Sequence, residues 1–459
     1  MPWFFVSVTH LQNLLPMSLK NRQRRLSMEV DSHVEELSMD SVRIAEQLKD
    51  AARFPIDSPN SSIDLEPLRA GGAPHNSVVV AMQLGASQLG TSHLSAACSA
   101  IIGQYSCHGT SDFRPKVNQD AGMLPAMQRD SSSPFPYPQI PPSTSAGSVS
   151  YPDDSSAMLL SVLDGHGADG SAVSSRAMTS IIAVLGGGGA ESKRLREDPA
   201  AALTAAFEAA QTQLVAAALR KELDANHSGA CSLVAYVREQ TLWIANAGDC
   251  ACVLATAQAN TTTASDKKAV QSGSRYVARK LSMEHKVEEP NEKTRLEASG
   301  AWVRPAVYEA NGELSCPARL YRCKGEDSRR LGPGLAISRA LGDIDAVSCG
   351  LLFTPDVQKH TLQALPAAAD GTPSDAEHDA FLILASDGVW EFLSAQAACD
   401  LVAPIYARGG TAAEACKALI EQAQQCWKAD DDEYSDDITA IVVFIPALLA
   451  ALGTGIPLF

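Results

Sequence analysis

The chain has 459 residues, of which 45% are apolar, so it can bury a sizeable core as one large domain with extensions or as two or three average domains. Its 37 basic and 53 acidic residues give a net charge of −16, which argues against nucleic acid or an anionic membrane as the main partner. The 11 cysteines are odd in number and lack metal-ligand spacing, which is typical of a reducing compartment. We therefore expect a protein of the cytoplasm, the nucleus or both.

The first 97 residues have no sustained hydrophobic period, and we predict a largely disordered extension there. Residues 1–17 are moderately apolar, but a basic cluster follows them, which is the reverse order of a secretory signal. The cluster ends in Arg24-Arg25-Leu26-Ser27, a pattern that basophilic kinases favour, although a solvated basic patch in a tail is the commoner meaning. Residues 41–54 could form a short amphipathic helix.

Strands and helices follow one another in the remainder of the chain. The expected strands are short apolar runs bounded by turn residues, and the expected helices carry apolar residues three and four apart. Thr411 and Glu414 form a capping-box pattern at the start of one helix. In chain order we expect strands at 101–106, in the run from Met158 to Asp164, at 231–237, 241–247, 252–255, in the run 381–390 and at 438–444, and helices at 172–185, 199–223, 395–406 and 411–428.

Charged side chains stand at the ends of several of these runs, in four short stretches. They are LDGHG around Asp164, ISRALGD before Ile344, LASDGVWEFLS around Asp387 and SDDITAIVV from Ser435. Glycines in such turns let the backbone approach a ligand closely. A hard divalent ion prefers carboxylate and carbonyl oxygens, and a reaction that expels an alkoxide needs a proton donor such as histidine. Each stretch alone could also be a plain turn.

Taken together and in this order, the four stretches resemble the PP2C-type (PPM family) metal-dependent protein serine/threonine phosphatases. The resemblance covers roughly residues 99–446 and implies one domain at 98–446. The implied fold is an α+β four-layer sandwich, in which two antiparallel β-sheets pack face to face with helices on both outer sides. Residues 447–459 are then an apolar C-terminal tail, which is short for a membrane span but leaves membrane association open. Proline-rich or polar composition predicts loop insertions near 121–156, 256–275 and 304–330.

The resemblance also implies a centre with two Mg²⁺ or Mn²⁺ ions. Asp164 would bridge both ions, Asp387 and Asp436 would complete the first, and the Gly165 carbonyl and Asp120 would help to hold the second. Several carboxylates brought together cannot all stay ionised unless cations neutralise them. Oxygen ligands favour Mg²⁺ or Mn²⁺, whereas Zn²⁺ would need a cluster of Cys or His.

Hydrolysis of phosphoserine or phosphothreonine in a phosphoprotein is the implied reaction. A water between the ions would attack phosphorus, Asp120 would belong to the catalytic set, and His166 would protonate the departing oxygen. Either Arg114 or Lys116 would steady the phosphate. A third, weaker ion is possible at Asp249 and Glu391, and a plain turn aspartate is an equally good interpretation of Asp249.

The chain departs from the family pattern at two places. Gln119 stands where the family has a glutamate, so we expect the second metal to be held less tightly or through water. Cys250-Ala251 follows Asp249 where the family often has Ser-Arg. These departures leave open an inactive or weak PP2C-like pseudophosphatase that acts as a binding module, and a hydrolase of small phosphoesters is a third possibility. We expect Arg339 to hold loops together, and we expect a monomer.

Overall fold

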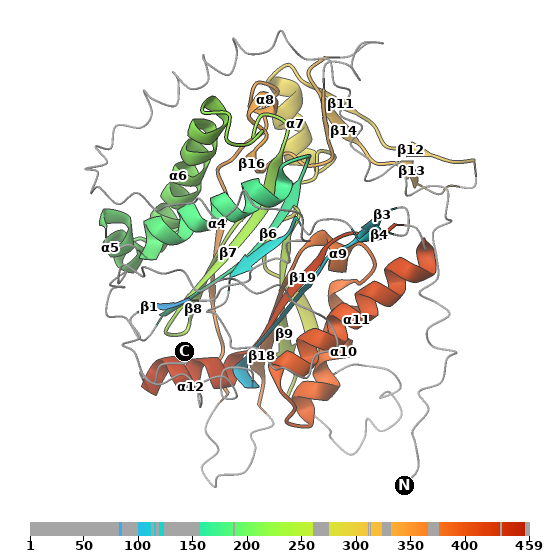
Figure 1. Ribbon diagram of the computed structural model, residues 1–459. Coiled ribbons are helices and arrows are strands. Elements are labelled where there is room, and N and C mark those ends of the chain that lie inside the picture. Colours follow the sequence, from blue (N-terminus) through green and yellow to red (C-terminus); the bar gives the residue numbers. More distant parts are fainter. Residues whose placement is uncertain are drawn as a thin grey trace, which may run out of the picture.

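The computed structural model (Figure 1) describes twelve stretches of the chain. The predicted helix at 41–54, the kinase pattern at Ser27 and the candidate Lys116 lie outside these residues. The described residues are 82–84, 100–111, 114–115, 119–123, 157–186, 189–259, 275–310, 312, 314–323, 332–365, 376–431 and 434–454.

Two antiparallel sheets form the centre of the fold. The first sheet has the order β1 (Met82–Leu84), β6 (Ala157–His166), β7 (Gly229–Arg238), β8 (Thr241–Ala247) and β17 (Asp356–Thr361), with β5 (Ala121–Met123) paired to β6 and β16 (Leu341–Gly342) paired to β7. The second sheet has the order β10 (Tyr276–Lys280), β9 (Ala251–Ala257), β18 (His378–Ala385), β19 (Ile438–Phe444) and β2 (Ile102–Cys107).

Helices cover the outer face of each sheet, as Figure 1 shows. The first sheet carries α4 (Gly170–Gly186), α5 (Ala190–Glu197) and α6 (Pro199–Leu219), and the second carries α10 (Ala395–Ala407) and α11 (Ala412–Asp430). The α+β four-layer sandwich expected from the resemblance is therefore confirmed. Short elements connect these layers: β3 (Thr110–Ser111), β4 (Arg114–Pro115), α7 (Pro290–Ala298), β11 (Trp302–Arg304), β12 (Val307–Tyr308), β13 (Leu314–Cys316), β14 (Arg319–Tyr321), β15 (Pro333–Leu335), α8 (Ile344–Val347) and α9 (Asp387–Trp390).

Strand β6 shows how the layers divide the apolar residues. Met158, Leu160 and Val162 face the core between the sheets, whereas Leu159 and Leu163 face the helices on the outer side. Successive side chains of a strand point to opposite faces, and both faces of this sheet are covered. The run is therefore apolar throughout, and that apolar run is the signal from which the strand could be predicted.

Most predicted elements are found within one or two residues, and helix α6 is the clearest exception. It ends at Leu219, four residues before the predicted end at 223. Lys221 takes the left-handed conformation with φ 57°, and the amides of Lys221 and Glu222 donate back to the carbonyls of Ala218 and Ala217. This is the Schellman pattern that usually carries glycine, so the sequence gives little warning of it.

The fold extends beyond the predicted limits of the domain at both ends. Strand β1, from the N-terminal extension, pairs with β6. Helix α12 (Ile445–Thr454) begins one residue before Pro446, which the first turn of a helix tolerates, and it buries Ile445, Leu448 and Leu452 in the core between the sheets. None of the helices in the described ranges is both long and apolar enough to cross a membrane. The ten cysteines of these ranges are all free.

Candidate metal centre and active site

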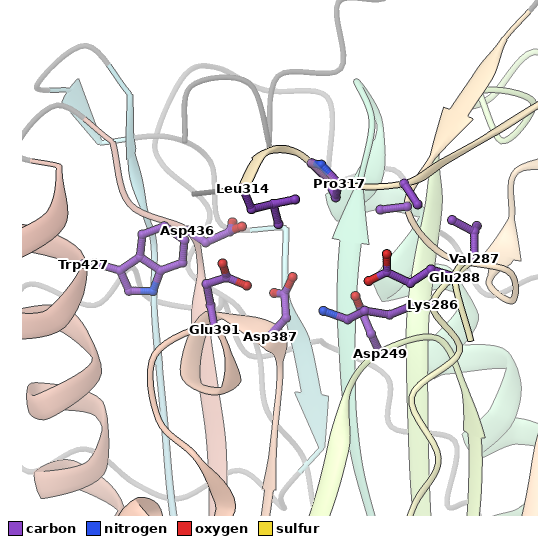
Figure 2. A pocket seen from close by; sticks show the side chains of 12 residues that line it. Asp249, Lys286, Val287, Glu288, Leu314, Pro317, Asp387, Glu391, Trp427 and Asp436 are labelled. Carbon is purple, nitrogen blue, oxygen red and sulfur yellow. The ribbon is translucent and has the colours of Figure 1, made fainter. Parts of the chain in front are cut away.

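Acidic residues from both sheets meet at one end of the sandwich, beside a pocket of about 210 Å³. Asp249 lies in the turn between β8 and β9, Asp387 begins α9 directly after β18, and Asp436 precedes β19. Figure 2 shows Asp387, Glu391 and Asp436 on one side of this pocket and Asp249 on the other. The structure therefore brings together four acidic residues that come from three separate stretches of the sequence.

Two glycines let the acidic turns come this close. A Cβ on Gly165 would lie 2.4 Å from the carbonyl oxygens of both Gln119 and Gly170, and the Gly165 amide donates to Gln119 at 3.1 Å. A Cβ on Gly388 would lie 2.1 Å from the carbonyl oxygen of Asp437. Any side chain at either position would push the Asp164 turn or the Asp387 turn away from its neighbours.

Three carboxyl groups at this end of the sandwich have raised pKa values. Burial, followed by the charges of Asp387 and Asp120, raises the pKa of Asp164 well above its usual range. Burial, followed by the charge of Asp249, raises the pKa of Asp387 well above its usual range. Burial, followed by the charge of Asp437, raises the pKa of Asp120 to about 7. Like charges confined in a poorly solvated space disfavour ionisation, and a bound cation would reverse this effect.

The residues at this site fit divalent cations of the Mg²⁺ or Mn²⁺ kind. Their donors are carboxylate oxygens and the Gly165 carbonyl, which are hard ligands. The Oδ1 atom of Asp387 is buried and makes no hydrogen bond within the described part of the chain, so it has room for a ligand bond. These same ranges hold no group of three Asp, Glu, His or Cys side chains already gathered for one ion. Mg²⁺ usually keeps several waters among its ligands, so it does not need such a group.

The neighbouring acidic residues Asp436 and Asp437 have different surroundings. Asp436 lines the pocket, and its role at the metals stays a prediction. Asp437 is only 3% exposed and accepts hydrogen bonds from the amides of Gly109 at 2.6 Å and Gln119 at 2.8 Å. It thus ties the β2 end and the Gln119 loop to β19. Sequence reasoning assigned Asp437 no role, because its partners are more than 300 residues away.

Gln119 holds the glycine turn that carries Asp164. Its Nε2 donates to the Gly167 carbonyl at 2.6 Å, and its backbone carbonyl accepts from the Gly165 amide and from Ser174 Oγ. A glutamate carboxylate could not donate the first of these bonds. The amide side chain therefore has a structural partner in the turn itself.

Replacing Gln119 by Glu tests whether the second metal is held weakly. The new carboxylate is expected to lower the Mn²⁺ concentration that gives half-maximal activity, because it adds a stronger oxygen ligand. Gln119→Ala is the matched control, since it removes the bond to Gly167 without adding charge and should not lower that concentration. An unchanged half-saturating Mn²⁺ concentration in Gln119→Glu would contradict a weak second metal.

His166, at the end of β6, is paired with an acidic residue that sequence reasoning did not assign to the site. Its Nε2 lies 2.6 Å from Oδ2 of Asp343, the last residue of the ISRALGD stretch. Burial lowers the pKa of His166, but the charge and hydrogen bond of Asp343 outweigh burial, so the pKa is raised overall.

A lysine also faces the acidic pocket and was missed. Figure 2 shows the Lys286 side chain pointing into the pocket from the side opposite Asp387. Burial lowers the pKa of Lys286, but Asp249 and Asp387 outweigh it and keep the amine charged. Of the two predicted phosphate ligands, Arg114 lies in β4 and Lys116 falls outside the described residues. Lys286 is thus a further cation near the expected phosphate.

Arg339 has the structural surroundings expected for it. Its Nη2 and Nε donate to Glu292 Oε1 at 2.6 and 3.2 Å, and Nη1 donates to the Thr354 carbonyl at 3.4 Å. The other oxygen of Glu292 accepts from Arg295 at 2.5 Å and from Ser338 at 2.7 Å. The arginine therefore ties α7 to two loops and does not line the pocket.

Stability at different pH values tests the repulsion among the buried carboxylates. A raised carboxyl pKa contributes stability below its ordinary value of 3.8 and loses it as the pH rises through the folded-state value, which is about 7 for Asp120 and higher than usual for Asp164. In EDTA, the Tm is expected to fall as the pH rises from about 4 through 7, and Mn²⁺ should remove most of that fall. Equal pH dependence with and without Mn²⁺ would contradict the expectation.

Comparison with known proteins shows which family the chain belongs to. The sequence profile described as protein phosphatase 2C matches residues 143–431, which is more than half of the chain and includes Asp164, Asp249 and Asp387. The match leaves out Asp120 and Asp436, although their charges reach Asp164 in the structure. The chain belongs to the protein phosphatase 2C family.

Curated relatives from plants give the same family. The chain is 32% identical over 49% of its length to probable protein phosphatase 2C 48 of Oryza sativa subsp. japonica, of which the match spans 54%. It is 30% identical over 63% of its length to probable protein phosphatase 2C 61 of the same plant, of which the match spans 75%. A serine-threonine phosphatase 2C structure from Toxoplasma gondii has 19% identity and a TM-score of 0.49, over 80% of this chain and 99% of that one.

Proposed function

We propose that this protein is a metal-dependent phosphatase that hydrolyses phosphoserine and phosphothreonine in protein substrates. The observation that carries the proposal is the meeting of Asp387, Asp436 and Asp249 beside one pocket, with Asp164 close enough for its pKa to be raised by Asp387. Membership of the protein phosphatase 2C family supports the same reaction. No cysteine is needed as a nucleophile, and burial raises the pKa of Cys250, which disfavours its thiolate.

The chain's own residues have distinct tasks in this reaction. Asp164, Asp387, Asp436, Asp120 and the Gly165 carbonyl would hold the ions. When bound, two such ions supply an activated water and neutralise phosphoryl oxygens. The position of these residues near the ends of the sandwich sheets supports this role, because ligands held in place before substrate arrives need little reorganisation.

Proton and phosphate handling fall to the basic side chains. The phosphorus–oxygen ester bond breaks while a new bond forms from phosphorus to the water oxygen, and His166 gives its proton to the leaving serine or threonine oxygen. Lys286 adds a positive charge beside the phosphoryl group, together with Arg114 or Lys116.

The proposal is tested by phosphate release from a phosphothreonine peptide with Mn²⁺ or Mg²⁺ and with EDTA. We expect turnover with either ion and none in EDTA. A folded sample that binds the peptide but releases no phosphate would support a pseudophosphatase instead. Hydrolysis of small phosphoesters without hydrolysis of the peptide would indicate the small-phosphoester alternative.

A further inference from the structure

The side chain of Asp343 lies directly behind His166. The two residues are 177 positions apart, yet Nε2 of His166 and Oδ2 of Asp343 are 2.6 Å from each other. Asp343 is 3% exposed at its side chain, whereas His166 is 22% exposed. The carboxylate is therefore buried, and the imidazole separates it from solvent.

Three adjacent strands hold the two residues together. His166 on β6 pairs with Gly229 on β7, and Gly229 pairs with Gly342 on β16, directly before Asp343. A Cβ at position 229 would lie 2.2 Å from the Asp343 carboxylate and 2.6 Å from the His166 ring. The absence of a side chain at Gly229 thus makes room for the contact.

A buried amide fixes the backbone from which Asp343 projects. Gln211 on α6 accepts from the Gly342 amide at 2.7 Å and donates to the Gly342 carbonyl at 3.0 Å. Asp343 itself has a φ of 43°, a left-handed conformation that aspartate and asparagine adopt more readily than other side chains, and its amide donates to the Ser228 carbonyl. The position of the carboxylate is therefore set by several independent bonds.

Only one nitrogen of the ring is engaged by Asp343. Because a carboxylate oxygen only accepts, we assign Nε2 as the donor of this 2.6 Å bond. Within the described residues, no hydrogen bond involves Nδ1 of His166. The Asp343 bond therefore leaves Nδ1 available for a second partner.

We propose that Asp343 is a positioning residue that fixes the proton of His166 on Nε2 and leaves Nδ1 as the nitrogen that protonates the leaving group. This inference rests on the proposed acid role of His166. In the step, the Nδ1–H bond breaks, the ester bond from phosphorus to oxygen breaks, and the proton completes the hydroxyl of serine or threonine. After this transfer the neutral ring keeps its proton on Nε2, and that proton stays hydrogen-bonded to Asp343. Water then returns a proton to Nδ1.

The test compares a phosphothreonine peptide, whose alkoxide needs a proton to leave, with p-nitrophenyl phosphate, whose phenolate does not. Asp343→Asn keeps the backbone conformation but removes the charge, so it is expected to lower kcat for the peptide at least about tenfold more than kcat for p-nitrophenyl phosphate. In a His166→Ala background, the same substitution should change the ratio of the two kcat values by less than about twofold, because the ring is absent.

A control variant and a measurement of ring ¹⁵N shifts distinguish the positioning role of Asp343 from a purely structural role. Asp345→Asn alters a nearby carboxylate that lies 3.3 Å from His227 instead, and it should leave the ratio unchanged. In metal-free protein, ring ¹⁵N shifts should show protonation at Nε2 of His166, and Asp343→Asn should mix the two ring forms. Equal losses on both substrates, or unchanged ring shifts in Asp343→Asn, would overturn the inference. Full peptide hydrolysis by His166→Ala would overturn the acid role instead, while the ring shifts would still test Asp343.

Discussion

Asp387→Asn is expected to lower kcat for a phosphothreonine peptide by about a thousandfold or more. Bound metal supplies several kcal/mol of transition-state stabilisation, and each tenfold in rate corresponds to about 1.4 kcal/mol. The substitution removes charge from the residue whose Oδ1 is buried without a hydrogen bond in the described part of the chain, so metal binding should weaken with activity. Calorimetric titration with Mn²⁺ measures the binding, and phosphate release measures the rate.

Metal-free stability gives a second measurement for the same variant. Burial and then Asp249 raise the pKa of Asp387, so its ionisation opposes folding at neutral pH. Asp387→Asn in EDTA is therefore expected to have a higher Tm than the wild type while being inactive. Asp400→Asn, at an exposed position of α10, is the matched control and should change neither property. Full activity in Asp387→Asn would exclude the proposed metal centre.

Glu292→Gln is expected to destabilise the fold by about 3 kcal/mol, because it leaves Arg339 and Arg295 without the charge that balances them. The Glu292 side chain is 6% exposed, whereas Arg295 and Arg339 are 29% and 19% exposed, so water replaces the lost charge only in part. Urea unfolding measures this loss. Lys417→Ala breaks the Lys417–Glu421 pair, in which both side chains are more than half exposed, and should cost less than about 0.5 kcal/mol.

The ionisation of Glu292 also makes the stability of the fold depend on pH in the acid range. Burial raises the pKa of Glu292, but the hydrogen bonds from Arg339 and Arg295 outweigh burial and lower it to about 2, from an ordinary value of 4.5. The stability that it contributes is present above the ordinary value and is lost as the pH falls towards 2. Glu292→Gln should therefore flatten the stability curve in this range. If Glu292→Gln lost stability at acid pH as steeply as the wild type, other carboxylates would determine the acid dependence.

Local signals in the sequence were sufficient for most elements. Strands 241–247 and 438–444 match β8 and β19 residue for residue, because each is an apolar run bounded by turn or acidic residues. The capping box of Thr411 and Glu414 is present at the start of α11. The end of α6 was missed because a lysine takes the conformation that glycine usually marks.

Residues of the candidate site could be predicted only where a local sequence motif marked them. Asp164 lies near the end of the apolar strand β6 and Asp387 comes shortly after β18, so their placement at the ends of the sheets could be expected from the resemblance. Asp343 and Lys286 gain their surroundings from contacts between distant loops, which no single stretch of sequence displays. Gln119 was interpreted only as a weaker ligand, because its bond to Gly167 depends on how the turn folds.

The proposed ions would also cross-link the two halves of the molecule. Asp164 comes from the first sheet, whereas Asp387 and Asp436 flank strands of the second. Ions held by all three residues would join the two sheets through coordination bonds. A ligand that binds only the folded state adds its binding free energy to folding. The supply of divalent cations in the surroundings would then set the lifetime of the protein as well as its rate of turnover.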